Sequence, residues 1–487
     1  MKRFNEVRTV HPKTNLLSPE ELEIIHGASL QILENTGVKV LSGWALDILR
    51  KAGARVDQGQ KHVTIPRELV EDALTIAPKT IRYGARNPRF DLTLNKAEIH
   101  FCTGGSPTCI MDWETGERRP STTEDLARWV RIADYLPNVH VVWPSVIPTD
   151  VPAPLQNLIT FITALRNTEK HIEHEALSAR DAQYSIEAAA AVVGGKEELR
   201  KRPIISAVQC PISPLRFEQG ITEGAMEYAK AGIPVVTLPM PLAGETGPAT
   251  LAGTIALGNA ENLAQLVILQ SVSPGAPVVY GSASAIANLR TGEYSPGSPE
   301  RALIQMAFAQ LACYYKLPSE ISSGNCDCKV PDIQAGFERT MTLTSAILLG
   351  GMDIIVCLGG IDASNAMSPE LLVIDNEIIE GLKRLARGFE LGPEDLALNV
   401  IQEVGPGGIF LGHKHTLQHF RKELWLPQIS DKNSFETWRK LGSQTMDKVA
   451  RGKVKEIVAT HEPPPLPENI EREISQIFSE AKTEFLS

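Results

Sequence analysis

The sequence lacks the short motifs that identify the common cofactor-binding enzymes. It has no GxGxxG turn opening a helix after a strand, no GxxxxGK[ST] loop, no HExxH, no CxxC and no GxSxG in a triad context. The usual signals for a dinucleotide, a nucleoside triphosphate, a zinc protease and a serine hydrolase are therefore missing. An enzyme of 487 residues without these motifs uses a rarer chemistry, or a cofactor that another protein carries.

Positive charge and long apolar runs are also scarce. The net charge is −10, from 48 Lys and Arg against 58 Asp and Glu. This balance disfavours nucleic acid and anionic membrane as partners, since both need a basic patch, but it is compatible with a cationic substrate. No run reaches the roughly 18–20 apolar residues of a membrane span. The polar start Met1–Arg8 lacks the apolar core of a signal peptide, so we expect a cytoplasmic protein.

The seven cysteines are scattered and odd in number. This pattern argues against a disulfide framework and suits a reducing compartment. We expect most of them to be small buried apolar residues.

What the sequence does contain is a repeated phrase between residues 203 and 362. A short β-branched run breaks into Pro, Gly, Ser or Asn, and a helix-like stretch follows. The runs are 203–209, 233–239, 277–282, 320–325 and 353–359. Short apolar strands alternating with helices indicate parallel βα units. A repeat of about 40–50 residues predicts a (β/α)8 TIM barrel, which belongs to the α/β class.

The rest of the chain completes this organisation. Strands are predicted at 140–144 and 170–175, and the eighth strand must lie near 98–104 or 108–112. The barrel helices are predicted at 121–135, 154–166, 179–193, 215–231, 249–272, 299–315 and 332–350. We expect three regions: an N-terminal α+β region over 1–97, the TIM-barrel catalytic domain over 98–367 and a C-terminal helical region over 368–487. The C-terminal helices are predicted at 369–387, 393–402, 435–451 and 468–486.

The loop that follows the predicted strand at 320–325 is the first candidate for chemistry. Asn325, Asp327 and Lys329 gather amide, carboxylate and amine groups there. TIM barrels keep their chemistry at the ends of their strands, so we predict that these residues are catalytic. The alternative is a solvated loop with a capping Asp. Cys326 and Cys328 offer thiolates to zinc, but one intervening residue is tight for a shared metal and no third ligand is evident, so we expect no bound metal.

A lone carboxylate and several aromatic residues are candidates for binding a cation. Glu245 lies in a stretch rich in Pro and Gly at the end of a predicted strand, where it either faces a cation or is an exposed loop residue. Tyr280 ends another predicted strand, and an aromatic face there is a natural wall for a quaternary ammonium group. Trp143, Phe101 and Phe410 are further candidates. Core packing is the alternative for each aromatic residue.

A histidine-rich segment lies near residues 407–419. His415 and His419 are four residues apart and would share a helix face. They form a metal pair or a binding element that closes over the barrel, or they fix the C-terminal region by hydrogen bonds.

Several longer motifs, in order, resemble the trimethylamine methyltransferase family over about residues 30–425. They are ILENTGV at 32–38, LPMPLAG at 238–244, PGAPVVYG at 274–281, PDIQAGFE at 331–338 and GHKHTL at 412–417. The resemblance implies a (β/α)8 barrel that transfers a methyl group from a methylated amine to the cobalt of a corrinoid (cobalamin) on a separate protein. The trimethylamine enzymes carry pyrrolysine in the barrel, whereas this chain contains only the twenty standard residues.

The resemblance therefore points to the non-pyrrolysine branch, whose members demethylate quaternary amines such as glycine betaine, proline betaine or carnitine. A quaternary nitrogen leaves as a neutral amine, so it needs no covalent adduct. A carboxylate on such a substrate needs a donor, for which Asn325, Lys329, Gln209, His174 and His415 are candidates. We also expect a homo-oligomer. The alternatives are a zinc-thiolate-dependent methyltransferase and a non-catalytic betaine-binding barrel.

Overall fold

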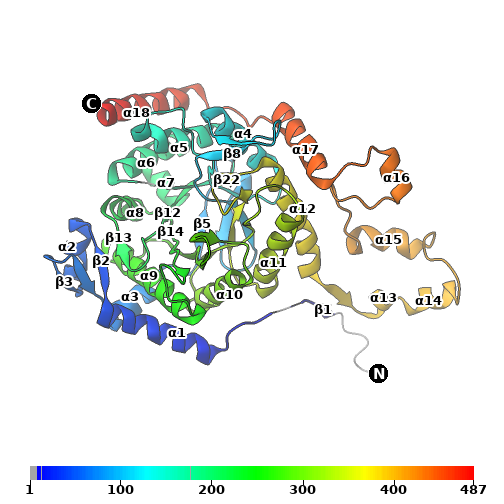
Figure 1. Ribbon diagram of the computed structural model, residues 1–487, viewed down its shortest axis with the longest axis horizontal. Helices are drawn as coiled ribbons and strands as arrows, with labels where there is room; N and C mark the ends of the chain where they lie inside the picture. Colours follow the sequence, from blue (N-terminus) through cyan, green and yellow to red (C-terminus); the bar gives the residue numbers. More distant parts are fainter. Residues whose placement is uncertain (1–7, 13, 176) are drawn as a thin grey trace.

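Eight parallel strands close into a barrel within the computed structural model, which describes residues 8–12, 14–175 and 177–487 (Figure 1). In order around the barrel they are β7 (His100–Thr103), β10 (Val141–Val142), β11 (His171–Glu175), β12 (Ile205–Gln209), β14 (Val235–Thr237), β16 (Val278–Ser282), β19 (Ser319–Ser322) and β20 (Ile354–Leu358). β20 pairs with β7 and closes the ring. The predicted TIM barrel is confirmed, and the segment near 98–104 supplies the eighth strand.

The barrel strands are buried on both faces, so successive side chains divide between two apolar clusters. Val141 of β10 and Trp143, which follows this strand, belong to the cluster inside the barrel, whereas Val142 of β10 belongs to the cluster between strands and helices. The same alternation on β11 sends His171, Glu173 and Glu175 inward.

Helices surround the strands, as the ring in Figure 1 shows. They are α4 (Thr123–Tyr135), α5 (Gln156–Asn167), α6 (Ala179–Val193), α7 (Lys196–Lys201), α8 (Gln219–Ala231), α9 (Leu251–Val272), α10 (Pro299–Tyr314), α11 (Ile333–Leu349) and α12 (Pro369–Arg387). Their starts follow local capping chemistry: Thr122 forms a capping box, and Ser298 and Ser368 each cap a helix that begins with Pro.

The N-terminal elements cover the outer side of α9. They are α1 (Pro19–Gln31), a π-helical turn (Ile32–Thr36), β2 (Val38–Val40), α2 (Gly43–Ala52), β3 (Arg55–Asp57), β4 (His62–Thr64) and α3 (Arg67–Ile76). Because α1, α2 and α3 pack on α9, that helix is buried from Thr254 to Gln270. The hairpin of β5 (Ile81–Tyr83) and β6 (Leu92–Leu94) contributes to the cluster inside the barrel, and Tyr83 stacks on His171 with ring centroids 4.0 Å apart.

Short strands cross the loops at the carboxyl ends of the barrel strands, and of these the sequence predicted only the one near 108–112, as a candidate for the eighth barrel strand. β8 (Cys109–Met111), β9 (Arg118–Pro120), β21 (Gly360–Ile361) and β22 (Ala366–Met367) form one sheet, and β15 (Leu242–Ala243), β17 (Ala285–Asn288) and β18 (Glu293–Ser295) form another. β13 (Arg216–Phe217) joins β2. These sheets tie the loops of the barrel mouth to one another.

After α12 the chain leaves the barrel as an arm, residues 388–445, which projects sideways in Figure 1. It contains β23 (Phe389–Leu391), which pairs with β1 (Arg8–Val10), and then α13 (Pro393–Leu396), α14 (Leu398–Val404), α15 (Lys414–Glu423) and α16 (Phe435–Lys440). The chain returns through α17 (Met446–Thr460) and α18 (Glu468–Leu486).

Two helices predicted in this region are wrong in extent. The helix predicted over 435–451 is broken between α16 and α17, where Gly442 and Ser443 have φ of 96° and 51°. The helix predicted over 393–402 breaks at Ala397, whose φ is 47°. A positive φ interrupts the right-handed helix at each point. Within the described ranges, every helix is too short or too polar to cross a membrane.

Candidate active site at the barrel mouth

A cavity of about 830 Å³ opens among the loops that follow β16, β19 and β20. Carboxylates outnumber cations along its wall: Glu293, Asp327, Asp332, Glu338 and Asp362 against Arg118 and Lys329. Tyr294 adds an aromatic ring. This wall has the chemistry of a site for an organic cation, and it lies on the face where TIM barrels carry their active sites.

Asp327 is half-buried in this wall and is held by three hydrogen bonds. Its Oδ2 accepts from Ser295 Oγ at 3.1 Å and from the Gly297 N–H at 2.8 Å, and its own N–H donates to Glu338 Oε2 at 2.7 Å. A Cβ at position 297 would lie 2.7 Å from Asp327 Oδ2, so only glycine leaves room for this contact. Burial raises the pKa of Asp327, and the neighbouring charge of Glu338 adds to the rise. A cation bound beside Asp327 would offset both its burial and its repulsion by Glu338, and so would favour the ionised carboxylate.

Lys329 reaches across the cavity to the loop after β20. Its Nζ lies 3.0 Å from Asp362 Oδ1, and Arg118 approaches the same carboxylate at 3.8 Å. Asp362, Ala363 and Ser364 have φ of 54°, 52° and 67°, a left-handed turn that is costly for residues other than glycine. Such strain gathers at functional sites, where surrounding contacts maintain it.

Asn325 lies behind the cavity wall rather than in it. Its side chain is fully buried, donates to Ser364 Oγ and accepts from the Cys326 N–H at 2.9 Å. The carbonyls of Cys326 and Cys328 accept from Ala363 and Asp362. Asn325 thus fastens the loop after β19 to the strained loop after β20.

A buried ion pair supports both loops from below. Arg339 of α11 contacts Asp375 of α12 at 2.6 Å, and both side chains are fully buried. Arg339 also donates to the carbonyls of Gly324 and Gly360, and Asp375 accepts from the Gly359 N–H at 2.7 Å. One cation therefore joins the two loops and the two helices that follow them.

Two buried carboxyl groups face each other deeper inside the barrel. Glu173 of β11 and Glu320 of β19 come from strands four positions apart around the ring, and neither side chain is exposed. Glu173 accepts from Ser206 Oγ at 3.2 Å, whereas the oxygens of Glu320 have no hydrogen-bond partner among the described residues. Burial raises the pKa of Glu173, and burial together with the charge of Glu173 raises the pKa of Glu320 further. Near neutral pH this pair therefore retains a proton.

These raised pKa values predict that stability falls as pH rises. The folded chain holds protons on Glu173 and Glu320 that the unfolded chain releases. The stability that these protons contribute is therefore complete at a pH below the pKa of an unfolded carboxyl group. It is lost as the pH rises through the raised pKa values of the folded state. Denaturant unfolding of the wild type should give a falling free energy of unfolding from about pH 5 to about pH 8. Glu173→Gln should flatten this dependence, and Glu114→Gln, at an exposed position, should not. An equally steep fall in Glu173→Gln would contradict the prediction.

Glu173 and Glu320 were not among the residues predicted from the sequence, although the residue pattern of β11 indicates one of them. Its sequence His171-Ile-Glu-His-Glu175 places a titratable residue at every second position of a buried strand. Glu175, the last of these, accepts from Ser106 Oγ at 3.1 Å, and burial raises its pKa. The sequence also missed Tyr294 and Glu338, because β18 and the packing of α11 bring them to the cavity.

The aromatic and polar residues predicted to bind substrate differ in which face of their strand they occupy: the inside of the barrel or the side toward the helices. Trp143 belongs to the cluster inside the barrel, together with Cys102 and Val208. Tyr280 faces the helices instead, where its hydroxyl donates to Asn259 Oδ1 of α9 at 2.7 Å and its ring lies near Phe308.

Three further candidates also lie on the outer side of the barrel. Phe101 packs in the cluster between strands and helices, and His174 stacks on Phe161 of α5 with ring centroids 5.0 Å apart. Gln209 donates to Thr222 of α8 at 3.3 Å. As a correction to the prediction, Tyr280, Phe101, His174 and Gln209 do not line the mouth, because strand alternation turns each toward the helices.

The remaining candidates lie on exposed segments. Glu245 is exposed in the loop after β14 and is not part of the cavity wall. Phe410 and His415 lie on the arm, away from the mouth (Figure 1). His415 does stack on His419, with ring centroids 4.1 Å apart, as their spacing predicts. Among the described residues, no group of three or more His, Cys, Asp or Glu side chains is placed to hold a metal ion.

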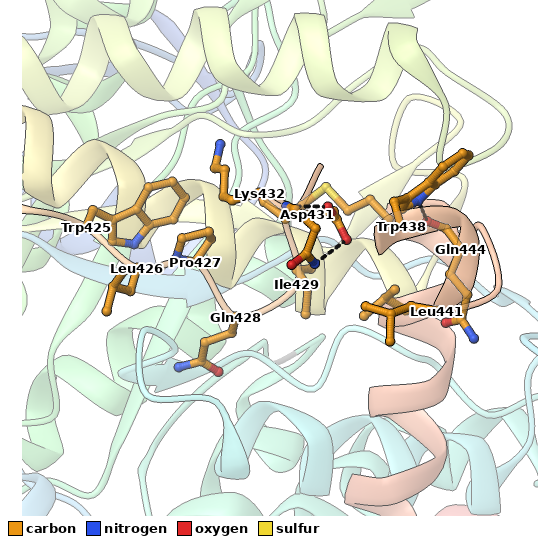
Figure 2. A pocket seen from close by; sticks show the side chains of 14 residues that line it. Trp425, Leu426, Pro427, Gln428, Ile429, Asp431, Lys432, Trp438, Leu441 and Gln444 are labelled. Atoms are coloured by element: carbon orange, nitrogen blue, oxygen red, sulfur yellow. Dashed lines mark hydrogen bonds between the residues drawn. The ribbon is translucent and has the colours of Figure 1, made fainter. Parts of the chain in front are cut away.

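A second cavity, of about 640 Å³, lies at the root of the arm (Figure 2). Trp425, Trp438 and Leu441 line it, and Trp438 Nε1 donates to the Gln444 carbonyl at 2.9 Å. Its walls come from the segment between α15 and α17 and from the first turn of α17, not from strand ends. It is therefore separate from the site at the mouth.

Comparison with known proteins covers the whole chain. A family model described as trimethylamine methyltransferase (MTTB) matches residues 1–485. The glycine betaine methyltransferase of Desulfitobacterium hafniense (strain Y51) is 34% identical over 470 residues, which cover 96% of this chain and 97% of that protein. The trimethylamine methyltransferase MttB of D. hafniense (strain DSM 10664 / DCB-2) is 36% identical over 470 residues, covering 96% and 94%.

A solved structure also matches. The crystal structure of the Methanosarcina barkeri monomethylamine methyltransferase matches 98% of this chain and 95% of that one, with a TM-score of 0.47 and 13% identity. The two D. hafniense relatives are nearly equally similar to this chain, so identity does not select between the two substrates in their names.

Proposed function

Because this chain belongs to the trimethylamine methyltransferase family, we propose that it moves a methyl group from a quaternary amine to the Co(I) of a corrinoid carried by a separate protein. The observation that supports the substrate class is the excess of carboxylates around the cavity at the barrel mouth. An enzyme that draws a permanent cation into this site needs negative charge and an aromatic face there, and the wall offers both.

The chemistry favours a quaternary over a tertiary amine. A quaternary nitrogen already carries its charge and leaves as a neutral amine, so the reaction needs neither a pyrrolysine adduct nor metal activation. Asp327 and Glu338 offer charge to the ammonium group and Tyr294 offers its ring, while Lys329, on the same loop as Asp327, can pair with a carboxylate on the substrate. Glycine betaine, which combines both charges, fits this arrangement.

The residues of this chain act by binding and orientation. The loops after β19 and β20 hold the ammonium end so that one N–CH₃ bond points out of the mouth, which is the geometry for in-line displacement. The corrinoid supplies the nucleophile, and the partner protein carries it. Closure of the mouth by that partner would exclude water.

Exposed apolar side chains on the segments that follow three of the barrel strands support this docking. Leu289 follows β16 and is 75% exposed, whereas Ile333 and Phe337 follow β19 and are 91% and 66% exposed. Ile212 follows β12, and Val330 adjoins Ile333. Large apolar side chains gathered on one face of a soluble protein mark an interaction surface. We assign these apolar side chains to the corrinoid protein, because the methyl acceptor must reach the same face.

Replacing Phe337 with Asp is expected to weaken docking without removing the substrate site. The apparent KM for the corrinoid protein should rise about tenfold or more, since a charge replaces an apolar contact. The KM for the amine should stay unchanged. Ile24→Asp, at an exposed position on α1 away from the mouth, is the matched control. Equal effects of the two variants would contradict the docking assignment.

The arm supports a homo-oligomer. α13, α15 and α16 bury no residue, yet Leu398, Ile401, Leu417 and Phe435 are exposed. Helices this short are marginal alone, which favours a partner that covers their apolar side chains. A second copy of this chain meets that need, with the cavity at the root of the arm (Figure 2) as a receiving surface.

Light scattering should give a mass of two or more chains of 53.1 kDa. Ile401→Asp should shift that mass toward the mass of one chain. A monomeric wild type would contradict the homo-oligomer.

The substrate is tested by incubating the protein with a reduced corrinoid and a panel of betaines and methylated amines, followed by nuclear magnetic resonance of the products. A quaternary amine losing one methyl group supports the proposal. Turnover of trimethylamine alone would contradict it. Activity that depends on zinc added to a metal-stripped sample would favour the zinc-thiolate alternative, and binding without turnover would favour a non-catalytic barrel.

A further inference from the structure

Two cysteines on the loop after β19 lie in contact. Cys326 Sγ and Cys328 Sγ are 2.8 Å apart, so only a short approach separates them from the bonded distance of about 2.05 Å in a disulfide. Both side chains are buried, with 0% and 1% exposure. The backbone thus already brings the two thiols together without help from any other segment.

The surroundings favour one of these thiols as a nucleophile. The hydrogen bond from Cys328 and the nearby cation of Arg339 lower the pKa of Cys326. The pKa of Cys328 is raised, chiefly by the same hydrogen bond and by burial. A pair with one activated sulfur beside a second thiol is the arrangement of a redox-active dithiol. Asp327 and Lys329, the neighbours of Cys328, line the open cavity, so a small oxidant can approach the loop from there.

We propose that Cys326 and Cys328 form a reversible disulfide that switches the loop carrying Asp327 and Lys329 between an active dithiol state and a less active oxidised state. The oxidant is a small disulfide compound. The Cys326 thiolate attacks one sulfur of that compound and releases its first thiol. Cys328 then attacks Cys326 and releases the second thiol. Two S–H bonds and the external S–S bond are lost, while one internal S–S bond and two external thiols form.

The effect on the mouth follows from the position of Asp327 between the two sulfurs. Closing the ring draws Cys326 and Cys328 together and turns the peptide units that flank Asp327. Its contacts with Ser295 and Gly297, and those of the two cysteine carbonyls with Asp362 and Ala363, depend on those peptide units. The part of the inference that concerns activity rests on the proposed methyl transfer, whereas disulfide formation does not.

The test is to map the thiols of the full chain. The protein is treated with oxidised glutathione, free thiols are alkylated, and the digest is analysed by mass spectrometry. We expect the peptide carrying Cys326 and Cys328 to lose two hydrogen atoms and to resist alkylation until it is reduced. Cys313, which is exposed and contacts no other cysteine among the described residues, should carry glutathione instead. Alkylation of both Cys326 and Cys328 in a sample whose Cys313 is modified would overturn the proposal.

Variants and activity provide the second readout. Cys313→Ser should still form the internal disulfide, whereas Cys328→Ser should not. Oxidation should lower methyl transfer at least about tenfold, through misplacement of the binding loop, and dithiothreitol should restore it. If the wild type forms the disulfide and keeps full activity, the switch is overturned although the modification stands. The mapping uses neither amine nor corrinoid, so it remains informative if the proposed function fails.

Discussion

Replacing Arg339 with Met is expected to lower the free energy of unfolding by about 3–5 kcal/mol. The change leaves the Asp375 carboxylate buried without its counter-charge, and burial already raises the pKa of that group. It also removes the donors to the carbonyls of Gly324 and Gly360. Both loops of the barrel mouth then lose their common support, so activity should fall together with stability.

The measurement is denaturant unfolding of wild type and variants at fixed pH. Lys329→Met is the control, because its ammonium group is solvent-exposed and its ion pair with Asp362 should be worth about 1 kcal/mol or less. The double variant Arg339→Met with Asp375→Leu removes both charges. It should recover part of the free energy of unfolding that Arg339→Met loses, because no unpaired charge remains buried. A loss in Arg339→Met no larger than in Lys329→Met would contradict this role.

Replacing Asp327 with Asn is expected to reduce kcat/KM for a quaternary amine about 30- to 100-fold. The amide keeps the shape of the side chain and can still accept from Ser295 and Gly297, so the loop should remain in place. What is lost is the charge beside the ammonium group. The effect should appear in steady-state kinetics at saturating corrinoid protein, with thermal stability close to that of the wild type.

Glu245→Gln is the matched comparison for this variant. Glu245 is an exposed carboxylate on a neighbouring loop of the same face, but it is not part of the cavity wall. We expect kcat/KM to stay within about twofold of the wild type, as is usual for exposed substitutions. If Glu245→Gln has the larger effect, the cation binds near the loop after β14 and the cavity assignment is wrong.

The barrel could be predicted because its signal is local. The five strands between residues 203 and 362 are short β-branched runs, and each break into Gly, Pro, Ser or Asn marks the point where a strand ends and the mouth begins. For the same reason the loop of Asp327 and Lys329 could be named as a candidate from its position alone. The helices also had local signals, and α6, α12 and α18 begin and end close to where the sequence places them.

The sequence could not predict in the same way which side chains of a strand point into the barrel and which point toward the helices. Alternation shows that Tyr280 and Ser282 share a face, but a barrel strand is buried on both faces, so the sequence does not say which face is inside. Tyr280 faces outward because α9 and α10 provide its partners. The pairing of Glu173 with Glu320 joins strands 147 residues apart in the chain, and only closure of the barrel brings them together.

The proposed methyl transfer is tested most directly by the absorption spectrum of a reduced corrinoid protein mixed with this enzyme and one amine at a time. We expect a quaternary amine such as glycine betaine to convert the Co(I) spectrum to that of the methylated corrinoid, and we expect no conversion with trimethylamine. Conversion with trimethylamine and none with any quaternary amine would contradict it.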